Sequence, residues 1–226
     1  MSDNILVPGP RVQRPWDARL ARRMVAPLAA SRVTPNHLTT VRLAVGLAGA
    51  AAFMQGTYGW SNIAALLVVL SNFLDHADGE LARLSGKTSR AGHVYDLASD
   101  AAVTILLFVA MGIGIGTSSD NLLGVPPPVL GAIAGTAVAL IFYLRMRIED
   151  IGGKAASRQA SLGGFETEDI LYLLPLVTLG DGIMPFLIAA SLGAPLFAVW
   201  VVFDHRRVTR RSKPMTASAN SGTGLV

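Results

Sequence analysis

Four aspartates of this sequence stand inside or at the end of apolar segments, at spacings that favour shared chemistry. Asp75 and Asp78 are three residues apart. Asp96 and Asp100 are four residues apart, so each pair occupies one face if its segment is helical. An acidic residue at the centre of a bilayer costs about 2.5–3.5 kcal/mol on insertion scales, so this group needs compensation. Carboxylate oxygens favour Mg²⁺, Mn²⁺ or Ca²⁺ over zinc, and a pair of such ions can assist a displacement at phosphorus.

The order of the aspartates along the chain predicts that the two pairs face each other. If their segments form antiparallel helices that turn near Lys87, Asp75 lies level with Asp100, and Asp78 lies level with Asp96. With a rise of 1.5 Å per residue, both levels lie roughly 13–20 Å along the helices from the turn. We therefore expect a site for two divalent cations at or just below one membrane surface.

The composition indicates a lipid bilayer as the surrounding solvent. Hydrophobic residues make up 51% of the 226 residues, charged residues make up 15%, and the mean hydropathy is +0.48. A soluble globular chain carries about 25% charged residues, so this chain has too few to cover a surface in water. The absence of cysteine excludes a disulfide-stabilised secreted domain.

Apolar runs predict an all-α integral membrane protein with six transmembrane helices and an N-terminal interfacial amphipathic helix. The six spans are expected near residues 38–55, 61–82, 93–116, 128–146, 162–179 and 183–203. Three acids stand in the first turns of the fifth span, where they either line a cavity or cap the helix, namely Glu166, Glu168 and Asp169. The predicted division is a cytoplasmic N-terminal segment, a transmembrane catalytic domain and a basic, then disordered tail, at residues 1–34, 35–205 and 206–226.

The basic residues predict the orientation of these spans. With six spans, all 19 Lys and Arg residues fall on one side of the membrane, which is then the cytoplasmic side. Both termini and the aspartate site are expected there, in a multi-pass protein of the inner (cytoplasmic) membrane. Because topology accounts for the net charge of +4, nucleic acid is not an expected partner.

Before the first span, four apolar residues recur every fourth position, which is typical of one helix face. These residues are Trp16, Leu20, Met24 and Leu28. Arginines occupy the other faces of this segment, so we expect a helix lying on the cytoplasmic leaflet. The alternative is a solvated basic arm.

Residues 75–100 read DHADGELARLSGKTSRAGHVYDLASD. This segment resembles the signature of the CDP-alcohol phosphatidyltransferases, D-x2-D-G-x2-A-R-x8-G-x3-D-x3-D. The specified positions are all matched, by Asp75, Asp78, Gly79, Ala82, Arg83, Gly92, Asp96 and Asp100. Thr34, Pro35 and Asn36 also resemble the segment with which the family usually begins its first span.

The resemblance implies transfer of a phosphatidyl group from CDP-diacylglycerol to an alcohol, with release of CMP. It implies that the four aspartates hold two divalent cations, Mg²⁺ or Mn²⁺ with Ca²⁺ as a further possibility, and that Asp100 is also the general base. The nucleotide-binding residues that it implies are Asn36, Asp78, Gly79, Ala82, Arg83 and Gly92. From the residues alone, the glycines and Ala82 could instead serve close helix packing. The family also implies a homodimer.

The acceptor alcohol is less defined by the sequence. If it carries a phosphate, as inositol-1-phosphate or glycerol-3-phosphate does in relatives, then Arg90, Arg145 and Arg147 are candidates to bind it. The alternative is that these arginines only mark the cytoplasmic side. His76 is adjacent to Asp75 and has no assigned role.

Three other functions are compatible with parts of the pattern. A phospho-alcohol could pass from a CDP-linked polar alcohol to a lipid acceptor, which is the same chemistry in the other direction. An ion-coupled transporter would also use intramembrane carboxylates, but it would spread them over several spans. A structural membrane protein with a regulatory metal site would explain the aspartates but not the glycines, Ala82 and Arg83 of the signature.

Overall fold

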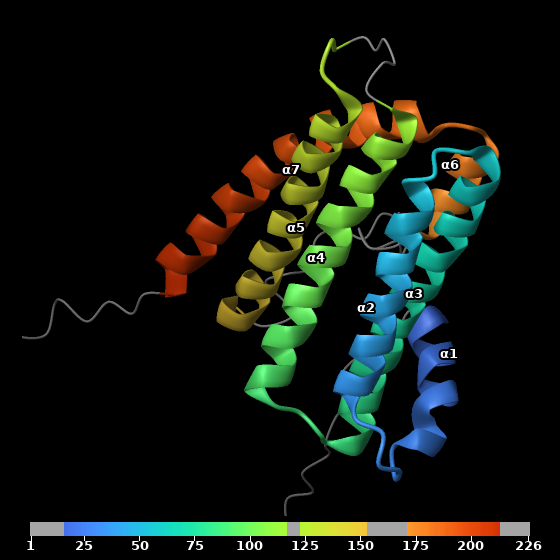
Figure 1. Ribbon diagram of the computed structural model, residues 1–226. Coiled ribbons are helices and arrows are strands. Elements are labelled where there is room, and N and C mark those ends of the chain that lie inside the picture. Colours follow the sequence, from blue (N-terminus) through green and yellow to red (C-terminus); the bar gives the residue numbers. More distant parts are fainter. Residues whose placement is uncertain (1–15, 117–122, 153–170, 213–226) are drawn as a thin grey trace, which may run out of the picture.

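The computed structural model describes residues 16–116, 123–152 and 171–212, and within these residues every regular element is helical (Figure 1). The prediction of an all-α chain is therefore confirmed. The elements in order are α1 (Trp16–Val25), the short 3-10 helix η1 (Ala26–Leu28), α2 (Pro35–Phe53), α3 (Tyr58–Ser85), α4 (Arg90–Ile115), α5 (Pro127–Gly152), α6 (Leu174–Leu179) and α7 (Ile183–Ser212).

Three of these helices, α4, α5 and α7, are long and apolar enough to cross a membrane. Helices also occupy the first and second predicted spans, as α2 and α3. Polar side chains within them, including Arg42 and Asp75, dilute the apolar character that a span requires. Six membrane crossings therefore remain a prediction, and so does the division of the chain into three segments.

The fifth predicted span lies mostly outside the described residues. Of residues 162–179, the structure describes only 171–179, which contain α6. The predicted C-terminal tail is likewise outside the described part, apart from the end of α7.

Helix α1 occupies the place of the predicted interfacial helix. Its Ala21 and Val25 pack against Ala77 and Leu81 of α3, and all four are buried. Leu20 and Met24 on the predicted apolar stripe are 44% and 60% exposed. This face is available to a membrane surface, but its location there remains a prediction.

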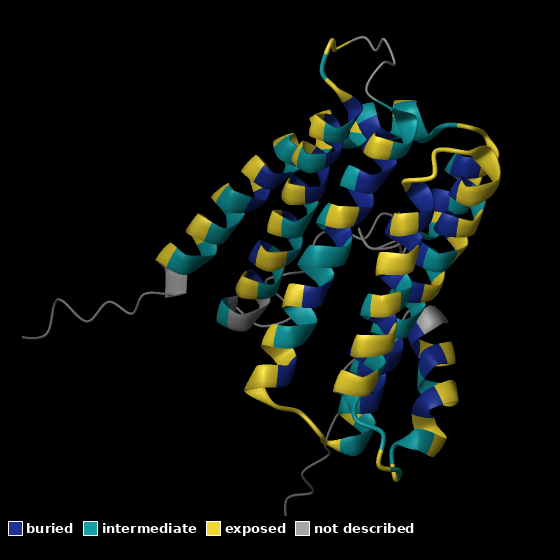
Figure 2. Cartoon of the chain, in the orientation of Figure 1, coloured by how far each residue is buried: buried dark blue, intermediate teal, exposed yellow. Residues whose placement is uncertain are grey.

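Helix α2 packs against both α3 and α4 and lies between them (Figure 1). In the described residues α3 and α4 run antiparallel, as expected, but they do not pack directly against each other. Small residues allow α2 to approach closely: a side chain on Gly46 would collide with Val103 of α4 and Ser71 of α3. The residues buried between the helices appear as the dark faces in Figure 2. The consequence for the site is that a third helix contributes side chains between the two aspartate pairs.

Candidate active site

The turn between α3 and α4 places both aspartate pairs at the same end of the bundle (Figure 1). Helix α3 ends at Ser85 and is capped by Gly86, which has a φ of +67°, a left-handed conformation that glycine adopts without a steric penalty. Helix α4 begins after Ser89, whose side-chain oxygen accepts a hydrogen bond of 3.0 Å from the Gly92 N–H. These caps set the end of α3 and the start of α4, the two helices that carry the aspartates.

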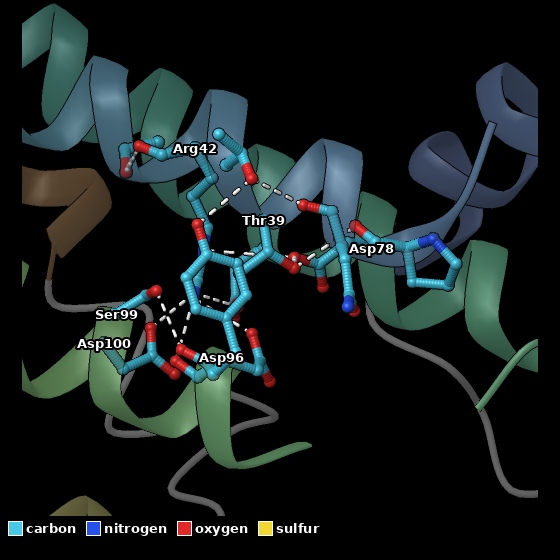
Figure 3. A network of polar contacts seen from close by, with 12 residues as sticks. Thr39, Arg42, Asp78, Asp96, Ser99 and Asp100 are labelled. Carbon is cyan, nitrogen blue, oxygen red and sulfur yellow. Dashed lines mark hydrogen bonds and ion pairs between the residues drawn. The ribbon is translucent and has the colours of Figure 1, made fainter. Parts of the chain in front are cut away.

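Arg42 of α2 lies among the four aspartates, three of which, Asp78, Asp96 and Asp100, are labelled with it in Figure 3. Its Nη1 donates to Oδ1 of Asp75 and to Oδ1 of Asp100. Its Nη2 donates to Oδ1 of Asp96 at 2.9 Å and to the Asp96 carbonyl oxygen at 3.2 Å. Its Nε lies 3.9 Å from Oδ2 of Asp78. One guanidinium therefore forms ion pairs with all four carboxylates.

Sequence reasoning assigned Arg42 only to the set of basic residues that mark one side of the membrane, and so it missed this contact. A signal was present, because Arg42 is the one charged residue in the predicted span 38–55. A charge inside a membrane span usually faces a partner of opposite sign. Two further observations support the place of Arg42: the Ser71 hydroxyl of α3 donates to the Arg42 carbonyl oxygen at 3.1 Å, and the Arg42 side chain is only 4% exposed.

Three of the aspartates lie close enough together to hold a metal ion. Asp75, Asp78 and Asp96 each place one carboxylate oxygen within 4.8 Å of the others. Asp100 is not in this group, but it shares Nη1 of Arg42 with Asp75. That shared contact agrees with the prediction that Asp75 and Asp100 lie at one level.

The aspartates differ in how far they are open to the outside. The side chain of Asp78 is 6% exposed and accepts a hydrogen bond of 2.8 Å from the Thr39 hydroxyl of α2. The side chains of Asp75, Asp96 and Asp100 are 29%, 37% and 39% exposed. An all-oxygen set with one fixed, buried carboxylate and three accessible ones fits a hard divalent cation such as Mg²⁺ or Mn²⁺.

The two glycines of the predicted nucleotide pocket have different surroundings. A Cβ atom on Gly79 would meet only the end of the Arg83 side chain, at 3.9 Å, so helix packing does not require glycine there. A Cβ atom on Gly92 would lie 2.7 Å from Oδ1 of Asn36 and 3.0 Å from Oγ of Ser89. Close packing is therefore sufficient to explain Gly92, and it also brings Asn36 next to the start of α4.

Arg83 and Ala82 follow on the same helix. The Arg83 side chain is 58% exposed, and its Nη1 donates to Oε1 of Glu80 at 2.5 Å. Glu80 is only 1% exposed and also accepts from Nη1 of Arg22 on α1 at 3.3 Å. Sequence reasoning did not single out Glu80, whose link to α1 depends on tertiary contact. Ala82 is half-buried.

The three arginines proposed for the acceptor are spread over two helices. Arg90 is exposed at the start of α4, and Arg147 is exposed on α5. The Arg145 guanidinium lies over the Phe197 ring of α7, 5.7 Å from its centroid. Of the other polar residues considered above, His76 is half-buried on α3. Glu166, Glu168 and Asp169 lie outside the described residues.

Comparison with known proteins gives both curated relatives and a solved structure. The bifunctional IPC transferase and DIPP synthase of Rubrobacter xylanophilus is 30% identical over 138 residues, which are 61% of this chain. That match spans only 29% of the relative's length. The phosphatidylinositol phosphate synthase of Streptomyces avermitilis is 26% identical over 95% of this chain and 86% of its own length.

The crystal structure of Mycobacterium tuberculosis phosphatidylinositol phosphate synthase, with CDP-DAG bound, has a similar fold. The TM-score is 0.54 at 22% sequence identity, and the match covers 92% of this chain and 100% of that one. The family model for CDP-alcohol phosphatidyltransferase matches residues 32–203, which include the whole aspartate site. Because this match covers most of the chain, the protein belongs to the CDP-alcohol phosphatidyltransferase family.

Proposed function

We propose that this protein transfers a phosphatidyl group from CDP-diacylglycerol to an alcohol and releases CMP. The observation that carries the proposal is the convergence of four aspartates from α3 and α4 on one point, in a chain of this family. Neither a transporter nor a structural protein accounts for that combination. Acids of a transport pathway would be distributed along the membrane, whereas these four share a single guanidinium.

Two divalent cations, Mg²⁺ or Mn²⁺, would be held by the four aspartates, Asp75, Asp78, Asp96 and Asp100. Bound there, the cations supply charge neutralisation at the pyrophosphate of the donor. The support for this assignment is the oxygen-only set, the grouping of three carboxylates within 4.8 Å, and the partial exposure of three of the four.

Asp100 would act as the general base. Its carboxylate takes the proton of the acceptor hydroxyl while the hydroxyl oxygen forms a bond to the phosphorus of the phosphatidyl group. The bond from that phosphorus to the oxygen of CMP breaks, and CMP leaves with the electron pair. Asp100 suits this role because its side chain is partly exposed and lies outside the three-carboxylate group.

The nucleotide part of the donor would lie along α3 beside Gly79, Ala82 and Arg83. The space next to Gly79 is open, which is what close approach of a ligand to the helix backbone requires. Arg83 is exposed and can turn from Glu80 toward a phosphate. Asn36 and Gly92 would close the pocket on the side of α2 and α4.

For the acceptor we propose an inositol phosphate. The support is the activity of relatives, because the proteins of S. avermitilis and M. tuberculosis are phosphatidylinositol phosphate synthases. A phosphorylated acceptor would need cationic contacts, and Arg90, Arg145 and Arg147 are the candidates. The alternative is the same chemistry with a CDP-linked polar alcohol as the donor, and a protein that neither binds CDP-diacylglycerol nor releases CMP from it would favour that alternative.

The test is CMP release by the purified full chain in detergent with Mn²⁺. CDP-diacylglycerol is offered with inositol-1-phosphate, glycerol-3-phosphate, inositol, serine or phosphatidylglycerol, each in a separate reaction. We expect CMP only with inositol-1-phosphate and a lipid product that contains its phosphate. Release with another acceptor would correct the substrate. Binding of CDP-diacylglycerol without release from any acceptor would contradict the proposed reaction.

We also propose a multi-pass protein of the inner membrane with both termini and the site in the cytoplasm, and a homodimer. The distribution of the 19 basic residues supports the orientation, and the family supports the dimer. Because the chain has no cysteine, a single cysteine placed at Ser221 can report its side of the membrane. We expect an impermeant thiol reagent to label it only after the cells are opened. Labelling in intact cells would contradict this topology, and a monomeric mass in native mass spectrometry would contradict the dimer.

A further inference from the structure

Arg42 occupies a position that the transfer reaction alone does not explain. Its guanidinium enters the site from α2, the helix between the two that carry the aspartates, and its side chain is buried. The carboxylates of Asp75, Asp96 and Asp100 reach it from a more open side. The positive charge of Arg42 therefore lies on the buried side of the cluster, and the carboxylates of Asp75, Asp96 and Asp100 lie on its accessible side.

A cation at this site would need the same carboxylates that Arg42 contacts. The Arg42 guanidinium donates hydrogen bonds to Oδ1 of Asp75, Asp96 and Asp100. Asp75 and Asp96 also belong to the group that lies close enough together to hold a metal ion. A guanidinium and a divalent cation cannot both fill the centre of one small set of oxygens, because like charges at short distance repel strongly. Their binding to these aspartates is therefore linked.

We propose that Arg42 is the internal counter-ion of the cation-free site and competes with divalent cations for the aspartates. Without a cation, Arg42 holds the four carboxylates of α3 and α4 in one place. When a cation binds from the open side, Arg42 gives up the oxygens of Asp75, Asp96 and Asp100. Arg42 is thus a positioning residue: it keeps the empty site assembled and sets how much cation is required to fill it.

The proposal separates Arg42 from a simple structural link between α2 and its neighbours. A structural link would be needed equally with and without cation, and its loss would not change cation affinity. A competing counter-ion has opposite effects in the two states. Its loss weakens the cation-free protein and strengthens cation binding.

The test compares the wild type with Arg42→Gln, which removes the charge, and Arg42→Lys, which keeps it. Each full-length protein is purified in detergent, and its thermal unfolding midpoint is measured in EDTA and then across a Mn²⁺ titration, without substrates. The control is Arg206→Gln, the same charge change at an exposed position of α7.

We expect Arg42→Gln to unfold at a lower temperature than the wild type in EDTA. We also expect its half-maximal stabilisation to need at least tenfold less Mn²⁺. Arg42→Lys should need a Mn²⁺ concentration close to that of the wild type, and Arg206→Gln should match the wild type in both measurements. If Arg42→Gln needs as much Mn²⁺ as the wild type, or more, the proposal is overturned.

The proposal can still be tested if Arg42→Gln folds poorly. If Arg42→Gln is folded only when Mn²⁺ is present, the proposal is supported; if it is unfolded in both conditions, the structural explanation holds and the proposal is overturned. The inference rests on the cation site of the proposed function but can fail separately. A wild type that shows no response to Mn²⁺ contradicts the cation site itself, whereas a wild-type response that Arg42→Gln leaves unchanged contradicts only the role of Arg42.

Discussion

Replacement of Gly79 by alanine separates ligand binding from folding more cleanly than any other change in the signature. The added Cβ would meet one atom within 4 Å, Nη2 at the end of the Arg83 side chain at 3.9 Å, which is an ordinary contact. Gly79 lies inside helix α3, where alanine is more favourable than glycine by about 1 kcal/mol. The structure therefore predicts that Gly79→Ala folds at least as stably as the wild type.

Donor binding should respond in the opposite direction. If the nucleotide lies against the Gly79 backbone, the added methyl group occupies space that the ligand needs. Overpacking of this kind costs about 1–3 kcal/mol, which corresponds to a loss of roughly 5- to 150-fold in affinity for CDP-diacylglycerol. Gly79→Leu should lose more.

The assay measures the Kd for CDP-diacylglycerol in detergent with Mn²⁺, together with the thermal unfolding midpoint of the same sample. Gly59→Ala is the matched control, because Gly59 lies at the other end of α3 and a Cβ there meets nothing within 4 Å. Unchanged affinity in Gly79→Ala would refute the placement of the nucleotide. A fall in the unfolding midpoint would instead show that glycine serves helix packing.

Two further predictions concern the base and the helix core. Asp100→Asn should reduce CMP release by about 10²- to 10⁴-fold while CDP-diacylglycerol still binds, and near-normal turnover would remove Asp100 as the base. Gly114→Ala should lower the thermal unfolding midpoint, because its Cβ would lie 2.1 Å from the Phe53 carbonyl oxygen and would force α4 away from α2. Overpacking costs about 1–3 kcal/mol, and Gly193→Ala, with nothing within 4 Å of its Cβ and a position inside helix α7, should not lower the midpoint.

The positions of helices were predictable because long apolar runs and their interruptions are local properties of the chain. The segment 93–116 was expected as a span, and α4 covers Arg90–Ile115. The common level of Asp75 and Asp100 was predictable too, because the rise per residue fixes how far each lies from the turn. Spacing along the chain, however, gives position along a helix and not the distance between helices. It could not show that α2 lies between α3 and α4.

The charged contacts were harder to predict for the same reason. Arg42 and Asp100 are 58 residues apart in sequence, as are Arg22 and Glu80, so only the packing of helices brings each pair together. Counting basic residues by membrane side treated Arg42 as one member of a set. Asking which partner a lone charge in an apolar span must have would have directed attention to the aspartates.

The central claim is that the aspartate cluster performs cation-dependent transfer of a phosphatidyl group. The most direct measurement is the time course of CMP release from CDP-diacylglycerol and inositol-1-phosphate, with Mn²⁺ and then with excess EDTA, using the wild type and Asp75→Asn in parallel. We predict release by the wild type with Mn²⁺, its loss in EDTA, its return when Mn²⁺ is restored, and very little release by Asp75→Asn. Release that continues in full chelation, or at the wild-type rate in Asp75→Asn, would contradict the account.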